Sequence, residues 1–258
     1  MLCYTPSFLL IMHNLAYFSA FFASTPPEKF GFFTLLTVIF AVLGRVLRGV
    51  TTAGALAGGS VCLALLLSTG IGGFFLLLTV FVLTWVSTRL GRARKTRLGT
   101  AEARAGRDAL QVLANLGAAA TCALVFALVW PDQRLLIAMA AALAEAAADT
   151  MSSEIGQAFG GTPRLVTNWS KVAAGTNGAI TLAGTLAGVA GAVTVGLVGV
   201  LMSLFAWRGF PICAGAGLAG MFADSFLGAT LERRGLLGNN SVNFISTVIS
   251  AALAALLS

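Results

Sequence analysis

The stretch "LLIAMAAALAEAAADTMSSE", Leu135–Glu154, decides the fold class of this chain. Its first 13 residues contain a single charge, at Glu145. An apolar run of this kind, without the two-residue alternation of a half-buried strand, predicts a helix in the bilayer core, where every backbone amide needs an internal partner. The run nevertheless ends in two further acids, Asp149 and Glu154. Acids at this depth are costly and are usually functional.

The rest of the chain repeats the apolar pattern. Of its 258 residues, 58% are hydrophobic and only 10% are charged, whereas a soluble domain carries about 25% charged residues. We therefore predict an all-α, polytopic transmembrane helical bundle that forms one integral membrane domain over residues 1–258. Nine spans are expected, at 7–23, 30–47, 52–69, 70–90, 109–130, 134–150, 176–206, 209–229 and 241–257. The seventh is longer than a bilayer core, and it is left open as a tilted span, a broken span or two short passes.

The basic residues predict the orientation in the membrane. With the N-terminus inside and alternating spans, 13 of the 16 basic residues fall inside. Lys29, Arg134 and Arg208 fall outside, so the split agrees with the positive-inside rule. The net charge of +7 is thus mainly a topological signal and gives no reason to expect nucleic-acid binding. In a prokaryote we expect the plasma membrane, with the site on the cytoplasmic side.

The four cysteines are far apart and His13 is the only histidine, so neither a thiolate metal site nor histidine-based catalysis is expected. The Gly-rich motifs of P-loop and Rossmann nucleotide sites are also missing.

The acids after Ala144 predict a cation site. Glu145 and Asp149 share a helix face, whereas Glu154 is rotated from Asp149 by about 140° if the helix continues. If the helix ends near Met151, Glu154 can turn back toward Asp149, and the two carboxylates form a hard, oxygen-rich site suited to Mg²⁺. The alternative is a polar helix end solvated by lipid headgroups.

A further acid lies in "GLAGMFADSFLGATLE", where Gly217, Gly220, Asp224 and Gly228 fall on one helix face. Glycines beside a carboxylate allow another backbone or a ligand to approach it closely. The alternative for the glycines is helix packing alone, which does not explain Asp224.

Two polar stripes begin other spans. Asp108, Gln111 and Asn115 in "GRDALQVLAN" share a face and predict either a site lining or hydrogen bonds between helices. Asp108 also suits a helix N-terminus. Asn243 in "GNNSVNFIST" predicts an amide that holds a base, a phosphate or a metal-bound water, with helix capping as the alternative.

The segment "GTNG", Gly175–Gly178, precedes an expected helix start. Backbone amides at a helix N-terminus bind anions, and Lys171 and Arg164 are near in sequence, so a phosphate site is expected there. The alternative is an Asn-Gly turn that leads into a packing face.

Taken together, "GRDALQVLANLG", "ADTMSSEIGQAFGGTPRLVTNWSKVAAGTNGAITLAGTLAG", "ADSFLGATLE" and "LGNNSVNFIS" resemble the integral membrane family that contains phytyl-phosphate kinase of the vitamin E (tocopherol) pathway. The resemblance runs from about Thr51 to the C-terminus. It implies an isoprenoid (phytyl or prenyl) monophosphate kinase that takes a phosphoryl group from a nucleoside triphosphate. CTP is the expected donor, because neighbouring lipid kinases use it. One departure is Asn177, where relatives carry an acid.

The expected site follows from these motifs and from phosphoryl-transfer chemistry, which needs positioning and charge neutralisation. Asp149, Glu154 and Asp224 are the expected catalytic acids and Mg²⁺ ligands. The prenyl tail would lie between helices in membrane lipid. The residues expected to bind substrate or nucleotide are Arg107, Asp108, Gln111, Asn115, Arg164, Lys171, Thr176, Asn177 and Asn243.

The competing hypothesis is a transporter or lipid flippase. Intramembrane carboxylates, glycine-interrupted helices and a long seventh span are typical of transporters. The carboxylates gather at one predicted face rather than at mid-depth, and no inverted repeat is evident, so the sequence favours an enzyme.

Overall fold

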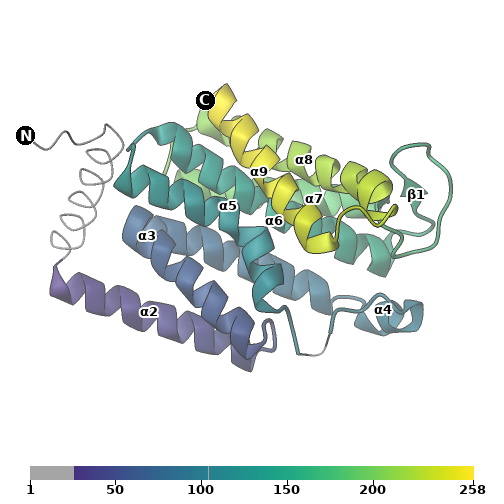
Figure 1. The fold of residues 1–258 in the computed structure, drawn as a ribbon, viewed down its shortest axis with the longest axis horizontal. Coiled ribbons are helices and arrows are strands. Elements are labelled where there is room, and N and C mark those ends of the chain that lie inside the picture. The colour runs from purple at the N-terminus through teal and green to yellow at the C-terminus, as the bar shows by residue number, and fades with distance from the viewer. Residues whose placement is uncertain (1–25, 104) are drawn as a thin grey trace, which may run out of the picture.

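The computed structural model describes residues 26–103 and 105–258 and confirms the all-α, polytopic bundle (Figure 1). Eight helical segments in this part of the chain are long and apolar enough to cross a membrane. The first predicted span, with His13, lies outside the described residues. The elements in chain order are α2 (Pro27–Val46), α3 (Thr52–Arg89), α4 (Arg92–Leu98), α5 (Ala109–Leu128), α6 (Gln133–Phe159), β1 (Arg164–Leu165), β2 (Ala179–Ile180), α7 (Leu182–Leu201), α8 (Gly209–Leu227), the π-helical turn η1 (Gly228–Glu232) and α9 (Asn239–Leu257).

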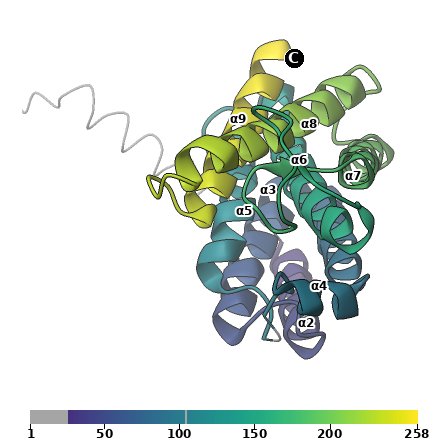
Figure 2. The same cartoon turned by 90° about the vertical axis from the view of Figure 1, so that its right-hand side faces the viewer.

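Helix α6 forms the centre of the bundle, with α3, α5, α7, α8 and α9 packed around it (Figure 2). The alanine-rich run that defined the fold class is buried without interruption from Ile137 to Ala148. Small side chains let neighbouring backbones approach closely. In lipid, where the hydrophobic effect does not drive helices together, this close packing stabilises helix association. The acids on α6 are therefore enclosed by protein rather than by lipid.

Helix α3 is a hairpin of two membrane-spanning arms, which confirms the predicted spans 52–69 and 70–90. Gly70 makes the reversal, with φ 67° and ψ −154°, a backbone conformation open almost only to glycine. The ends of the hairpin therefore meet: the indole Nε1 of Trp85 donates to the carbonyl of Leu47, 3.2 Å away. This pairing places the start of α3, the end of α3 and helix α4 at one end of the bundle.

Two predicted spans have different lengths in the structure. The sixth was expected to end at 150, but α6 continues to Phe159. The seventh is a single helix of 20 residues, so the 31-residue estimate is wrong. The segment before it pairs as strand β2 with β1 in an antiparallel ribbon, and Thr181 caps α7 by accepting from the amide of Gly184 at 3.0 Å. The helix expected to follow Gly175–Gly178 therefore begins at Leu182, after strand β2.

The helix ends divide the basic residues as the positive-inside rule requires. Helix α4, the β1–β2 ribbon and the loop between η1 and α9 lie at one end of the bundle, on the right in Figure 1. The described arginines and lysines that we placed inside lie in these elements, at the ends of α2 and α3, or just before α5. Lys29, Arg134 and Arg208 lie at helix starts on the opposite end. We call the first of these the basic end.

Candidate functional site

A polar cavity of about 270 Å³ lies at the basic end, between α5, α6, α8, α9 and the loop that follows α6. Acids outnumber bases in its lining. The charged lining residues are Glu102, Arg107, Asp149, Glu154, Asp224 and Glu232. Amides and hydroxyls supply most of the remaining lining, so we call this space the acidic cavity. A surplus of carboxylates in a polar space is typical of a site for a hard cation.

Asp149 of α6 and Asp224 of α8 both line this cavity, and their carboxyl groups are close enough to interact. The glycine face of α8 makes this approach possible: a Cβ at Gly220 would lie 2.6 Å from Cγ of Glu145 on α6. Within the described residues, neither aspartate forms an ion pair with a basic side chain. Two neighbouring carboxylates that form no ion pair can share a cation.

Polar side chains of α5, α6 and α9 form a network around Asp224. Ser246 Oγ donates to Glu145 Oε1 at 2.6 Å and lies 3.4 Å from Asp224 Oδ2. When its amide is oriented to suit its neighbours, Asn243 donates to Asp224 Oδ2 at 3.2 Å and accepts from Asn115 Nδ2 at 3.2 Å. The network joins α5, α6, α8 and α9, so it orients the Asp224 carboxyl. Sequence reasoning placed Asn115 and Asn243 near the site but gave Ser246 no role.

Glu154 lines the same cavity but binds Lys95. Because α6 continues past Met151, the expected helix end that would turn Glu154 toward Asp149 does not form. The fully buried ammonium of Lys95 donates to Glu154 Oε2 and to the carbonyls of Ser87 and Thr88 at 3.1 and 2.8 Å. One oxygen of Glu154 is thus occupied in an ion pair that ties α4 to α3 and α6.

The donor set fits Mg²⁺ in a limited way. Among residues 26–103 and 105–258, no three His, Cys, Asp or Glu side chains are grouped as a metal site. Mg²⁺, however, is commonly held by one or two carboxylates while waters and substrate phosphates complete its shell. Asp149 and Asp224 match that pattern.

The structure gathers most of the other predicted site residues. Six of them line the acidic cavity, namely Arg107, Gln111, Asn115, Thr176, Asn177 and Asn243. Asp108 instead caps α5 in a capping box: it accepts from the amide of Gln111, whose side chain accepts from the amide of Asp108, each at 2.8 Å. Arg164 and Lys171 form an antiparallel β-bridge through their backbones, and both residues are exposed. They line neither this cavity nor the one described next.

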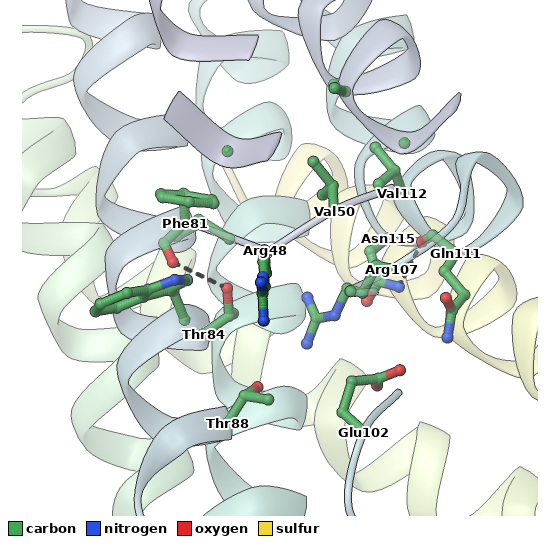
Figure 3. A pocket seen from close by; sticks show the side chains of 18 of the residues that line it. Arg48, Val50, Phe81, Thr84, Thr88, Glu102, Arg107, Gln111, Val112 and Asn115 are labelled. Carbon is green, nitrogen blue, oxygen red and sulfur yellow. Dashed lines mark hydrogen bonds between the residues drawn. The ribbon is translucent and has the colours of Figure 1, made fainter. Parts of the chain in front are cut away.

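A second cavity of about 400 Å³ adjoins the first, between α2, α3 and α5 (Figure 3). Its walls are apolar, with Phe40, Leu77 and Val112 among them, and four arginines line it. We call it the arginine cavity. Its arginines are Arg48, Arg89, Arg92 and Arg107. The two cavities share the lining residues Glu102, Arg107, Gln111 and Asn115.

Sequence reasoning missed Arg48, Arg89 and Arg92 as candidates, because basic residues at span ends already had an explanation in topology. No local signal in the sequence marked Arg48, because α2 ends at Val46 and Arg48 lies beyond it with a φ of 53°.

Comparison with known proteins gives the family. Residues 35–251 match the family described as integral membrane protein DUF92. The chain belongs to this family. An uncharacterised membrane protein of Methanocaldococcus jannaschii is 34% identical over 226 residues, which cover 86% of this chain and 92% of that protein. Protein PGR of Arabidopsis thaliana is 27% identical over 283 residues, covering 91% and 98%. The chloroplast protein VTE6 of the same plant is 29% identical over 217 residues, covering 78% and 65%.

The DUF92 match includes every residue that lines either cavity, from Phe40 to Asn243. No solved structure matches this chain significantly. The two cavities are therefore described from the structure of this chain alone.

Proposed function

We propose that this DUF92 protein is a membrane phosphotransferase that converts an isoprenoid monophosphate, such as phytyl phosphate, into the diphosphate at the expense of a nucleoside triphosphate. The observation that carries the proposal is the neighbouring pair Asp149 and Asp224 in the acidic cavity, directly beside a cavity with apolar walls. Family membership supports it, because the family includes phytyl-phosphate kinase. CTP is the proposed donor.

The residues of this site suit the chemistry of phosphoryl transfer. An oxygen of the acceptor phosphate attacks the terminal phosphorus of the donor, the bond from that phosphorus to the bridging oxygen breaks, and the nucleoside diphosphate leaves. The attacking group is already an ionised phosphate, so no strong general base is needed. Catalysis then depends on positioning and on offsetting negative charge.

The residues divide these tasks. Asp149 and Asp224 would hold Mg²⁺, which supplies charge neutralisation on the donor phosphates when bound. Arg107 lies close enough to attract Asp149 and also lines both cavities, so it can offset charge on the phosphate that is transferred. Asn243 and Ser246 orient Asp224. Glu154 acts through Lys95, as a positioning residue for α4.

Asn177 lies in the lining of the acidic cavity, on the loop before β2. Its loop packs tightly on the end of α8, where a side chain at Gly178 would collide with Ala229. Because the family resemblance leads us to expect an acid at position 177, we propose that this residue tunes donor or metal preference rather than the reaction itself.

The test is product formation by the purified protein with Mg²⁺, geranylgeranyl or phytyl monophosphate and each of the four nucleoside triphosphates. We expect a prenyl diphosphate and one nucleoside diphosphate in equal amounts, with the fastest rate for CTP. If no donor gives product while proteoliposomes of the same protein move a lipid or solute in an Asp149-dependent way, the protein is a transporter and the proposal fails.

A further inference from the structure

We propose that the arginine cavity is the acceptor site, in which an isoprenoid chain occupies the apolar part and Arg48 and Arg107 bind its phosphate. This assignment rests on the proposed function and adds to it a subsite, an orientation and a limit on chain length. Three independent features of the described residues support it, namely the cavity's walls, its charge and the backbone that positions its arginines.

The walls suit a hydrocarbon chain. Phe40 of α2, Leu77 and Phe81 of α3, and Val112 and Leu116 of α5 line the cavity. Its volume of about 400 Å³ lies within the range of sites that hold small molecules. Glycines keep part of this space open. A Cβ at Gly58 would meet only Val112 Cγ1, at 3.9 Å.

The charge at the cavity suits a phosphate. Four arginines and one acid, Glu102, line it, and within the described part of the chain none of these arginines forms an ion pair. The guanidinium groups of Arg48 and Arg107 extend into the same space (Figure 3). Two like charges brought together without an ion-pair partner favour an anion between them, and guanidinium groups bind phosphate in bidentate fashion.

The backbone holds these two arginines together although they are far apart in sequence. The amide of Thr51 donates to the carbonyl of Arg107 at 2.9 Å, and the amide of Arg107 donates to the carbonyl of Gly49 at 3.1 Å. At Gly106 a Cβ would lie 2.5 Å from the backbone of Gly49, so only glycine fits.

Arg48 itself has a φ of 53°. This conformation is strained for a non-glycine residue and tends to persist at functional sites.

The two cavities meet where the reaction needs them to meet. Arg107, Gln111 and Asn115 line both, so a phosphate between Arg48 and Arg107 lies at the boundary, with Asp149 and Asp224 on the far side. The isoprenoid enters with its tail toward α2 and its phosphate toward the acidic cavity. The donor nucleotide occupies the acidic cavity.

The first experiment measures binding of geranylgeranyl monophosphate to the protein in phosphatidylcholine nanodiscs, without nucleotide. We expect tight binding that needs both tail and phosphate, so geranylgeraniol and inorganic phosphate should compete weakly. Arg48→Asn, which keeps a residue tolerant of positive φ, and Arg107→Gln should each weaken binding roughly 10- to 100-fold through loss of a charge-assisted contact. Arg94→Gln is the control, because Arg94 is exposed on α4 and lines neither cavity.

The second experiment changes the space for the tail. Gly58→Leu fills the apolar part and should shift preference from geranylgeranyl to geranyl monophosphate by at least tenfold. Gly215→Leu is its matched control, since a side chain at Gly215 meets nothing within 4 Å.

The outcomes separate this inference from the proposed function. If phosphate transfer proceeds with an unchanged acceptor KM in Arg48→Asn and an unchanged chain preference in Gly58→Leu, the acceptor binds elsewhere and the inference is wrong, although the kinase assignment stands. If phosphatidic acid displaces the isoprenoid equally well, the cavity holds ordinary membrane lipid and the inference is also wrong. Variant-sensitive binding without any phosphate transfer would support the lipid-phosphate site and overturn the proposed reaction.

Discussion

Asp149 and Asp224 lie close together in a lining that contains more acids than bases, so their charge is the property on which the proposed reaction depends. Asp149→Asn and Asp224→Asn keep the size of the side chain and remove the charge. We expect each to keep the fold and to lower turnover by a factor of about 10² or more, as loss of a preorganised electrostatic contact does. The measurement is the initial rate of prenyl diphosphate formation at saturating substrates.

Asp132→Asn is the matched control. Asp132 caps α6 at the opposite end by accepting from the amide of Arg134 at 2.9 Å, and asparagine caps equally well. Equal losses of rate in all three variants would show that the effect comes from folding rather than from the site.

Residues differed in how well sequence could place them. Asp149 and Asp224 stood out because an acid in an apolar run has few explanations. The partner of Glu154 could not be foreseen, since Lys95 is 59 residues away and the end of α6 depends on its neighbours. The contact between the segments around Arg48 and Arg107 is also a long-range one. In the sequence, each of these arginines by itself was explained by membrane topology.

Among the helices, α4 is held against α6 by the buried ion pair between Lys95 and Glu154. Removing one member leaves a buried charge uncompensated, which costs about 3 kcal/mol or more. Lys95→Met and Glu154→Gln should therefore each lower the melting temperature in detergent by several degrees. The double variant Lys95→Met/Glu154→Leu should recover much of the loss, because an apolar pair replaces the buried ion pair. Additive losses would contradict this account.

The α3 hairpin depends on a single glycine. Gly70→Ala places a Cβ on a backbone at φ 67° and ψ −154°, so we expect a loss of about 2–3 kcal/mol in stability and a lower yield of folded protein. Gly215→Ala, in a regular and exposed part of α8, should be neutral or slightly stabilising. A stable Gly70→Ala protein would show that the hairpin tolerates another turn.

Hydropathy predicted most element boundaries well, because a span must match the bilayer. It failed on either side of the β1–β2 ribbon. There Ala179 and Ile180 begin a long apolar run that resembles the start of a helix, yet they pair as strand β2, and Ala179 lines the acidic cavity. The start of α7 therefore depends on how the preceding segment packs at the cavity rather than on the thickness of the membrane.

For the whole molecule, the charge distribution predicts that the basic end is inside. The structure puts the C-terminus at the opposite end from α4. Reporters inserted between Gly99 and Ala103 and fused after Ser258 should therefore report opposite sides, with the α4 reporter cytoplasmic. Two reporters on one side would contradict the eight-helix arrangement, and a reversed pair would place the site outside, away from nucleotide.

In the proposed reaction, the two cavities bring a lipid phosphate and a donor phosphate together. The most direct measurement follows γ-labelled CTP in a single turnover with geranylgeranyl monophosphate and Mg²⁺. The account predicts that label appears in the terminal phosphate of geranylgeranyl diphosphate, and that Asp149→Asn blocks this transfer. Label found only in inorganic phosphate, or transfer that Asp149→Asn leaves unchanged, would contradict it.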